Sequence, residues 1–355
     1  MSATVPFNAL KPAEDAADVR AAIDRVLASG WFILGPEVEA FEAEFAAASR
    51  VPHAVGVGTG TDAITLILRA LDIGAGDEVI TPPLSAAYSA LAVMMAGARP
   101  VFADIDPERL TLDPRATEAA ITARTRAIMP VHLYGQAADM RPLEAIAQQH
   151  NLAIVEDAAQ AHLATADGRP VGTIGVAAAT SFYPTKNLGA AGDGGAVLTR
   201  DAQLAARVKR LRNGGQTTRY RHDEFGVNSR LDEMQAAILR ARLKYLAGWT
   251  AKRRSIAARY RSALNGAGVT VPREFDAGHV YHLFPVLTDA RDRFQAHMKE
   301  RGIETLTTTP YRFRVSRLFS RPARPCVPSP TGSARKSCRC RCIRAFPTRP
   351  SQLWL

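Results

Sequence analysis

The chain has 355 residues and a formal net charge of +11, with 45 lysines and arginines against 34 aspartates and glutamates. The length allows two domains, or one large α/β domain with a smaller appendage. The net positive charge does not indicate a nucleic-acid-binding fold, because all of it lies in the C-terminal tail. Residues 305–355 hold 11 basic side chains and no acidic ones, and residues 1–304 hold equal numbers of basic and acidic side chains. We expect no nucleic-acid partner, and a basic arm in the tail is the less favoured alternative.

Hydropathy and cysteine usage narrow the class of protein further. The longest apolar stretch, around Ala90 to Ala98, is far shorter than the ~20 residues of a membrane span. We therefore expect a soluble, cytoplasmic protein without a membrane partner. The cysteines are confined to the tail, at Cys326, Cys338, Cys340 and Cys342. Their spacing is poor for zinc, so we expect neither a disulfide framework nor a metal site.

Two helices are predicted near the N-terminus. The first is amphipathic and covers residues 16–28. The second is indicated by helical spacing of Val38, Phe41, Glu42 and Phe45. Trp31 and Phe32 lie in the loop between the helices, where the sequence leaves core packing and substrate contact equally open.

The middle of the chain alternates short apolar runs with helical patterns. The runs, in order from residue 53, are HAVGV, EVITP, RPVFADI, AIMPVH and LAIVED. Helices are predicted near residues 63–71, 86–97, 114–121 and 140–150. This alternation predicts βαβ units and a mainly parallel sheet in an α/β fold, with ligands beyond the carboxyl ends of the strands.

The pattern in the last third of the chain predicts a long helix that connects the large domain to a smaller C-terminal one. A strand in GDGGAVLTR is followed by a helix over residues 201–211 and a long one from 229 past 260. A strand VYHLFPV and a helix over 293–301 come next. We predict a large domain over residues 1–250 with its N-terminal segment. The start of a small domain covers residues 251–306, and a basic tail covers 307–355.

Lys186 is the first candidate for chemistry. It stands in SFYPTKNLGAAGDGG, between a β-type run and a glycine-rich turn. A lysine amine at a strand end forms a Schiff base with an aldehyde cofactor when its surroundings let it shed a proton. On its own such a lysine is more often a solvated surface charge.

Two further motifs supply partners for Lys186. HAVGVGTGTDAITL ends a strand in glycines and opens a helix at Thr61 and Asp62, which suits a phosphate or is an ordinary helix cap. IVEDAAQAH places Asp157 at the end of a buried strand, where it can pair with a protonated pyridine nitrogen or merely cap a helix. Together with Lys186, they predict a pyridoxal-phosphate site.

The order of the motifs supports this interpretation. SGWFILGPEVEAFE, VHLYGQAADM, EDAAQAH, SFYPTKNLGAAGDGG and NSRLDEMQAAIL resemble the DegT/DnrJ-type pyridoxal-phosphate-dependent sugar-nucleotide aminotransferases, of fold type I in the aspartate-aminotransferase superfamily. The resemblance covers about Pro6 to Leu306. It implies a mainly parallel central sheet flanked by helices, with a smaller C-terminal α+β domain that is incomplete here.

The resemblance also implies roles for individual residues. Lys186 matches the Schiff-base lysine, Asp157 the partner of the pyridine nitrogen, and Gln160 the residue near the ring hydroxyl. The phosphate cradle of the family matches Gly60, Thr61, Asp62 and Ser181. Asn228 matches an asparagine that reaches the phosphate from the neighbouring subunit, which implies a homodimer with shared active sites.

The sequence departs from the family at one cofactor contact. Many relatives carry an aromatic residue that stacks on the ring where this chain has Ala86. Either Tyr88 takes over the stacking or the ring face is less well covered, and a core tyrosine is an equal alternative for Tyr88. Relatives that replace the lysine by histidine are dehydratases, so Lys186 favours transamination.

The reaction implied by the resemblance is a ping-pong transfer of an amino group. Glutamate, in preference to glutamine, donates the group, and a dTDP- or UDP-linked keto-deoxysugar receives it, with Lys186 as general base. Such reactions make amino sugars for polysaccharides or glycosylated metabolites. The sequence leaves the sugar, ring carbon and nucleotide open, with a lean to 3-keto sugars. The alternative is a dimeric relative impaired by its altered C-terminus.

The sequence of the tail, residues 307–355, indicates a shift of the reading frame in the coding DNA. One choice of codons for KSCRCRCIRAFPT reads VLSLPLHPGLPD when started at the third base, and TTTPYRFRVSRLF yields HYPIPFPRQPAF in the same phase. Both shifted segments resemble the family's C-terminal part. We therefore expect a one-nucleotide shift near Leu306; an uninterrupted frame in independent reads of the coding DNA contradicts it.

Overall fold

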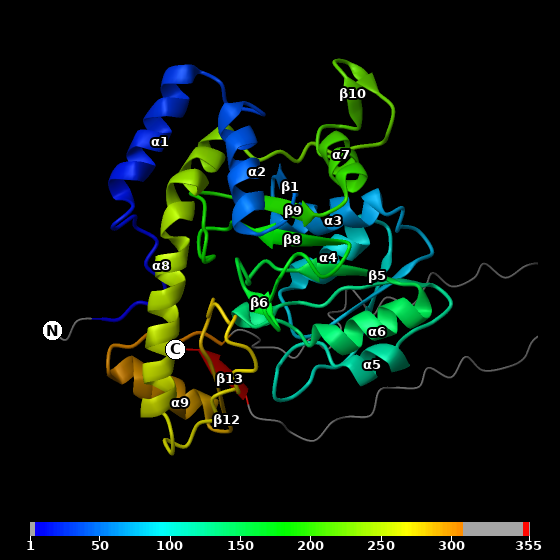
Figure 1. The fold of residues 1–355 in the computed structure, drawn as a ribbon. Coiled ribbons are helices and arrows are strands. Elements are labelled where there is room, and N and C mark those ends of the chain that lie inside the picture. The colour runs from blue at the N-terminus through cyan, green and yellow to red at the C-terminus, as the bar shows by residue number, and fades with distance from the viewer. Residues whose placement is uncertain (1–3, 308–350, 355) are drawn as a thin grey trace, which may run out of the picture.

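The computed structural model describes residues 4–307 and the backbone of residues 351–354 (Figure 1). The frame change and the zinc alternative concern residues beyond Leu306, almost all of which lie outside the described ranges. No helix in the described ranges has the length and apolar character needed to cross a bilayer.

A seven-stranded sheet forms the centre of the molecule. Its spatial order is β1 (His53–Val57), β9 (Gly195–Thr199), β8 (Ala177–Ser181), β5 (Ala153–Asp157), β4 (Thr125–Ile128), β2 (Glu78–Thr81) and β3 (Arg99–Phe102). Strand β9 is antiparallel to both of its neighbours, and the other pairs are parallel. The predicted mainly parallel α/β sheet is confirmed, and the carboxyl ends of its parallel strands share one edge.

Helices cover both faces of this sheet (Figure 1). One face packs in a single apolar cluster with α3 (Gly60–Ala70), α4 (Ala87–Met95) and α7 (Ala202–Leu211). The other face packs with α2 (Pro36–Ala48), α5 (Pro114–Ala119), α6 (Met140–His150) and the long α8 (Glu233–Ala263). The strands in the middle of the sheet, such as β8 and β9, are almost continuously apolar because helices bury both faces of the sheet.

A carboxylate from α8 fixes the start of α2. The first N–H groups of a helix have no acceptor within the helix. Glu233 accepts them instead, at 2.8 Å from the nitrogens of Gly35 and Glu37 and 2.9 Å from that of Val38. The negative charge also interacts favourably with the positive end of the helix dipole. Glu233 therefore holds the loop that carries Trp31 and Phe32.

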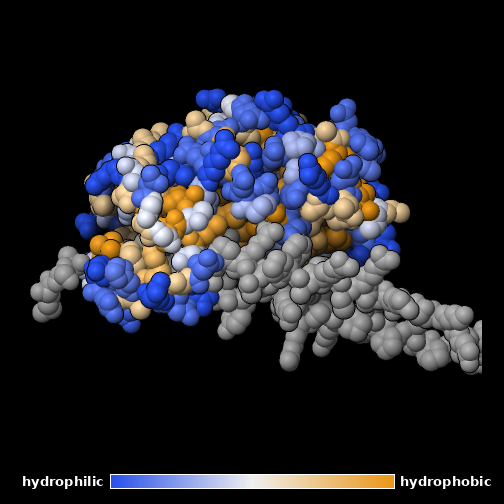
Figure 2. All heavy atoms as spheres, turned by 90° about the horizontal axis from the view of Figure 1, so that it is seen from below, coloured by the Kyte–Doolittle hydropathy of each residue, from blue (hydrophilic) through white to orange (hydrophobic). Residues whose placement is uncertain are grey.

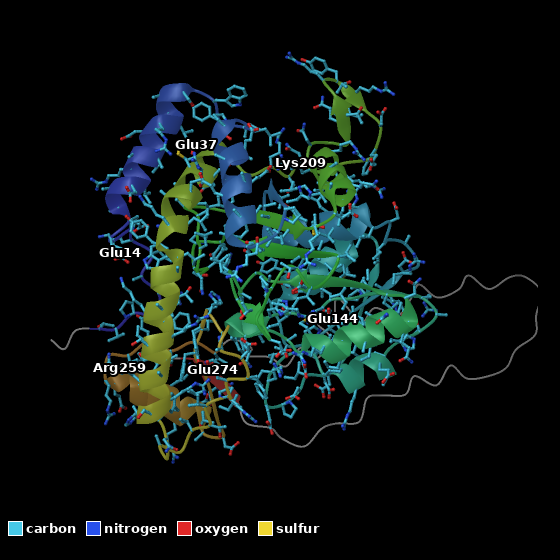
Figure 3. All side chains as sticks on the ribbon, viewed as in Figure 1. Glu14, Glu37, Glu144, Lys209, Arg259 and Glu274 are labelled. Carbon is cyan, nitrogen blue, oxygen red and sulfur yellow. The ribbon has the colours of Figure 1, made fainter. Side chains whose placement is uncertain are left out.

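Helix α1 (Ala16–Ser29) packs along α8, as predicted for an amphipathic segment. Glu37, labelled in Figure 3, joins three helices by accepting from Arg25 over 3.1 Å and from Arg240 over 2.7 Å. Helix α8 is unbroken across residues 250 and 251, so the proposed domain boundary falls inside it.

The C-terminal part packs at the far end of α8. Strand β12 (Pro285–Thr288) pairs antiparallel with β13 (Ser351–Trp354), beside α9 (Arg291–Glu300). The sequence predicted a strand over VYHLFPV, and only its last two residues are in β12. The preceding residues are irregular because Tyr281 has a φ of 46°. Positive φ is incompatible with a strand.

The remaining elements are short. They are η1 (Leu133–Gly135), β6 (Thr165–Ala166), β7 (Arg169–Pro170), β10 (Gln216–Thr218) and β11 (Arg221–His222). The β10–β11 hairpin projects from the body at the end of α7 (Figure 1).

Candidate active site

Two of the predicted residues lie at the carboxyl ends of adjacent strands. Asp157 ends β5 and pairs in register with Ala179 of β8, and Ser181 ends β8. Lys186 follows Ser181 in the next turn. The sheet therefore brings these side chains to one edge, where ligands of parallel sheets bind.

The carboxylate of Asp157 is buried and held at both oxygens. Oδ2 accepts a hydrogen bond from Ser89 of α4 over 2.7 Å, and Oδ1 accepts the N–H of Ala159 over 3.1 Å. The preceding Glu156 points to the opposite face, as side chains alternate along a strand. There it accepts from His132 over 3.0 Å and from three backbone N–H groups.

Lys186 stands on a tightly anchored turn. Its N–H donates to the carbonyl oxygen of Tyr183 over 2.8 Å, and Phe182 and Leu188 on either side are fully buried. Burial lowers the pKa of the Lys186 amine to about 8, and the Asp157 carboxylate partly opposes that shift. At neutral pH a usable fraction of the amine is unprotonated.

Two buried histidines lie near the lysine. His162 is 1% exposed, and neither ring nitrogen has a partner among the described residues. Burial, reinforced by the charge of Lys186, lowers its pKa to about 3. The same two causes hold the pKa of His282 well below its ordinary value. Both rings are neutral, so they add no charge around the amine.

The start of α3 forms a cradle with the end of β8. Thr59 caps the helix, its hydroxyl accepting the N–H of Asp62 over 3.0 Å. Helix geometry leaves the N–H groups of Gly60 and Thr61 without intrahelical acceptors. A Cβ on Gly60 would lie 2.7 Å from the Cβ of Ser181. Only glycine permits this approach, which brings the backbone and Cβ of Ser181 against the start of α3.

Ser229 secures this cradle from a distant part of the sequence. Its hydroxyl donates to Oδ2 of Asp62 over 2.8 Å and accepts the N–H of Gly58 over 3.0 Å. Asn228 comes immediately before it, forms an isolated bridge with Asn213, and is exposed.

Gln160 is oriented by the backbone of η1. Its Oε1 accepts the N–H of Tyr134 over 2.7 Å. Because the oxygen is engaged there, the amide nitrogen remains available as a donor.

Tyr88 does not belong to the core. It is 64% exposed on α4, so the core-tyrosine alternative is wrong. Ala86 directly precedes α4 as its N-cap residue, three residues before Ser89.

The assembled residues fit a phosphorylated pyridine aldehyde. A buried amine of lowered pKa, a carboxylate and a tight helix start serve the three functional groups of pyridoxal phosphate. The start of α3, whose first N–H groups have no acceptor within the helix, suits the phosphate group. Within residues 4–307 no cluster of histidine, cysteine and carboxylate side chains is arranged to hold a metal ion.

Comparison with known proteins agrees with this geometry. The model of the DegT/DnrJ/EryC1/StrS aminotransferase family matches residues 13–321. The chain belongs to this family.

Individual members of the family are close in sequence and structure. The dTDP-3-amino-3,4,6-trideoxy-alpha-D-glucose transaminase of Streptomyces venezuelae is 51% identical over 325 residues, covering 90% of this chain and 86% of the relative. The dTDP-3-amino-3,6-dideoxy-alpha-D-galactopyranose transaminase of Aneurinibacillus thermoaerophilus is 48% identical over 82% of this chain and 81% of the relative. The crystal structure of S. venezuelae DesV, with a ketimine intermediate, has a TM-score of 0.87 at 50% identity, covering 91% of this chain and 89% of DesV.

Membership establishes the class of chemistry. This DegT/DnrJ/EryC1/StrS protein is a pyridoxal-phosphate-dependent aminotransferase. The alternative of an impaired relative finds no support in the comparisons.

Sequence reasoning missed three side chains of the site. Ser89, Asn187 and Ser229 were not predicted, although each is buried and hydrogen-bonded at its centre. One signal was present: Ser85 and Ser89 stand four residues apart, and their hydroxyls lie 2.9 Å from each other.

Proposed function

We propose that this aminotransferase transfers an amino group from glutamate to the keto carbon of a dTDP- or UDP-linked 3-keto-deoxysugar, in the synthesis of amino sugars. The observation that carries the proposal is the Lys186 amine of lowered pKa on the turn that follows β8, at the sheet edge where the Asp157 carboxylate ends the adjacent strand β5. The substrate class is supported by the two relatives above, whose names both describe 3-amino sugars linked to dTDP.

Each side chain then has a defined task. Pyridoxal phosphate, when bound, supplies an electron sink that lets an amino group leave one carbon and join another. Lys186 Nζ would hold the aldehyde, and as a free amine it would take and return the proton at the reacting carbon. Asp157 holds a proton at the ring nitrogen. Gln160 donates to the ring hydroxyl from its free amide nitrogen.

The phosphate is held by the start of α3. The N–H groups of Gly60 and Thr61 and the hydroxyl of Ser181 donate to it, while Asp62 orders the cradle through Ser229. The helix dipole favours its negative charge. We assign the open face of the ring to Tyr88, whose exposed side chain lies in the first turn of α4 next to Ser89.

We further propose a homodimer in which Asn228 completes the partner's phosphate site. Several large apolar side chains are exposed in the single chain: Trp31 at 57%, Phe32 at 49%, Tyr220 at 80% and Phe225 at 88%. The view from below also shows hydrophobic areas among hydrophilic ones (Figure 2). Exposed aromatic groups of this size are typical of interfaces.

The substrate assignment is tested with a panel of nucleotide sugars. Purified enzyme is incubated with 3-keto and 4-keto sugars linked to dTDP or UDP, with glutamate or glutamine, and product is identified by mass spectrometry. We expect amination of 3-keto sugars with glutamate and none by the Lys186→Ala variant. Amination of 4-keto sugars alone, or of none, contradicts the proposal.

The dimer is tested by mixing two inactive variants, Lys186→Ala and Asn228→Ala, after dissociation and reassociation. A mixed dimer regains one intact site, because one chain then supplies Lys186 and the other Asn228. When equal amounts are mixed, about half of the dimers are mixed dimers, and each of these has one intact site of two. We therefore expect about a quarter of the wild-type activity. No recovery in a mixture shown to exchange subunits contradicts a shared site.

A further inference from the structure

The turn that carries Lys186 is bonded to a segment almost a hundred residues further along the chain. Asn187 is 3% exposed and donates from Nδ2 to the carbonyl oxygen of Val280 over 3.0 Å. Its Oδ1 lies 3.2 Å from Nδ1 of His282. Because a carbonyl oxygen only accepts, the orientation of the amide is fixed. Nδ1 of His282 therefore carries the proton and donates to Asn187.

The segment 279–284 is wedged between separate apolar clusters. Val280 packs in the same cluster as Phe182 and Leu188, which flank the lysine turn. Tyr281 and Phe284 pack in a different cluster, in the C-terminal part of the molecule. Neighbouring residues thus insert into different cores, so the segment cannot shift against one core without disturbing the other.

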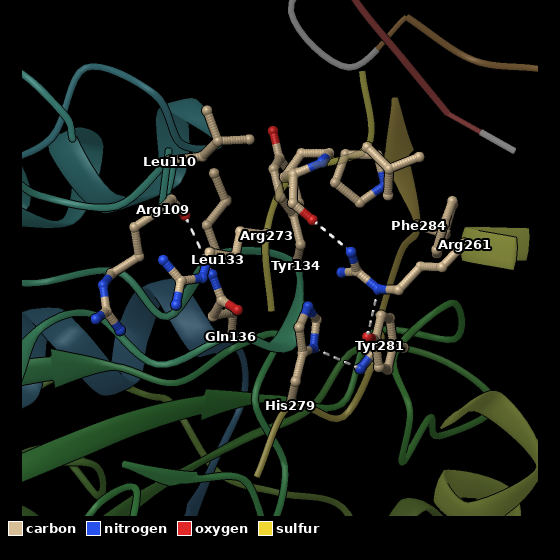
Figure 4. Close-up of a pocket in the computed structure, with 13 residues that line it drawn as sticks. Arg109, Leu110, Leu133, Tyr134, Gln136, Arg261, Arg273, His279, Tyr281 and Phe284 are labelled. Atoms are coloured by element: carbon tan, nitrogen blue, oxygen red, sulfur yellow. Dashed lines mark hydrogen bonds between the residues drawn. The ribbon is translucent and has the colours of Figure 1, made fainter. Parts of the chain in front are cut away.

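The same segment contacts the loop that orients Gln160. The N–H of Val280 donates to the carbonyl oxygen of Gly135 over 2.9 Å. Gly135 has a φ of 96°, and a Cβ there would lie 2.9 Å from the nitrogen of His282, so the approach requires glycine. Figure 4 shows Tyr134 and Tyr281 lining one pocket at this junction.

We infer that Asn187 is a positioning residue for Lys186, whose amide ties the lysine-bearing turn to Val280 and His282 and so makes the placement of the C-terminal domain part of the active-site geometry. The inference rests on the proposed role of Lys186. The lysine side chain is long and flexible, so the direction of its amine depends on how firmly its backbone is held. A displacement of about 1 Å at a reacting group costs about a hundredfold in rate.

The first test uses the apoprotein and hydrogen–deuterium exchange of peptides covering residues 182–190. Asn187→Ala and His282→Leu each remove a bond of the clamp. His282→Asn keeps a donor close to the position of Nδ1. Gln136→Ala is the matched control, because it removes a buried amide that accepts from Phe275 in the same junction and leaves Asn187 bonded. We expect exchange at least tenfold faster in the first two variants, and near wild-type exchange in the last two.

The second test compares steady-state constants of the holoenzyme. We expect Asn187→Ala to lower kcat by about ten- to a hundredfold with little change in the KM for glutamate, because substrate contacts are kept. The double variant with His282→Leu should lose no more than the worse single variant, since both act through one clamp. Wild-type exchange in Asn187→Ala, or additive losses, overturns the inference. Failure of the wild-type enzyme to transaminate would overturn the proposed function while leaving the exchange result valid.

Discussion

The hydroxyl of Ser89 donates to Oδ2 of Asp157 over 2.7 Å, joining α4 to the carboxylate that ends β5. Hydrogen bonds to a charged group contribute about 1.5–3 kcal/mol. We predict that Ser89→Ala loosens Asp157 and weakens pyridoxal-phosphate binding about tenfold, by the lower end of that range. Titration of apoprotein with the cofactor, followed by absorbance, measures this.

The control for this prediction is Ser85→Ala. Ser85 bonds Ser89 and, among the described residues, makes no hydrogen bond to the carboxylate itself. Its loss should change cofactor affinity by less than a factor of about three, because the Ser89 bond is kept. Equal weakening in both variants, or none in either, would show that the Ser89 bond does not hold Asp157 for the cofactor.

Gly60→Ala tests the cradle at the start of α3. The added Cβ would lie 2.7 Å from the Cβ of Ser181, so the strand end and the helix start must separate. We predict a loss of cofactor affinity of about a hundredfold or more, because preorganised phosphate donors move apart. Gly248→Ala is the control: it lies inside α8 with open space around it, and there alanine should stabilise by about 0.5–1 kcal/mol. Unchanged affinity in Gly60→Ala would contradict the cradle.

The pKa of Lys186 predicts how cofactor capture depends on pH. Only the unprotonated amine attacks an aldehyde, and burial lowers the pKa of this amine to about 8 against an ordinary 10.5. The rate of capture should therefore rise with pH to a half-maximum near pH 8. In Asp157→Asn the opposing carboxylate charge is absent, so the half-point should move lower. Stopped-flow absorbance at several pH values measures both; a half-point near 10.5 in the wild type would refute the buried amine.

Buried His162 predicts sensitivity to acid. The unfolded chain binds a proton at this ring near pH 6.5, and the folded chain only near pH 3. Stability is therefore full above pH 6.5 and falls as pH decreases towards 3, by at most about 1.4 kcal/mol per pH unit from this group. His162→Leu should flatten the fall in the free energy of unfolding between pH 7 and 5. Denaturant unfolding at several pH values measures this free energy, and His150→Gln, at an exposed helix end, is the control. The prediction is contradicted if the free energy of unfolding of His162→Leu falls with decreasing pH as steeply as that of the wild type.

The sheet and the main site residues were predictable because their signals are local. Asp157 and Lys186 each follow an apolar run, and the strand-end rule brings them to one edge. The irregular segment before β12 was not predictable, since the positive φ of Tyr281 is imposed by docking against Gly135. The pairing of Ser89 with Asp157 joins residues 68 positions apart, and no periodicity records such a contact.

Covalent trapping of the cofactor tests the central assignment most directly. The protein is loaded with pyridoxal phosphate, reduced with borohydride, digested with a protease that does not cleave at lysine, and mapped by mass spectrometry. The account predicts a stable phosphopyridoxyl group on Lys186 and its absence when glutamate is added first. A label on another lysine, or no label on a protein that binds the cofactor, would contradict it.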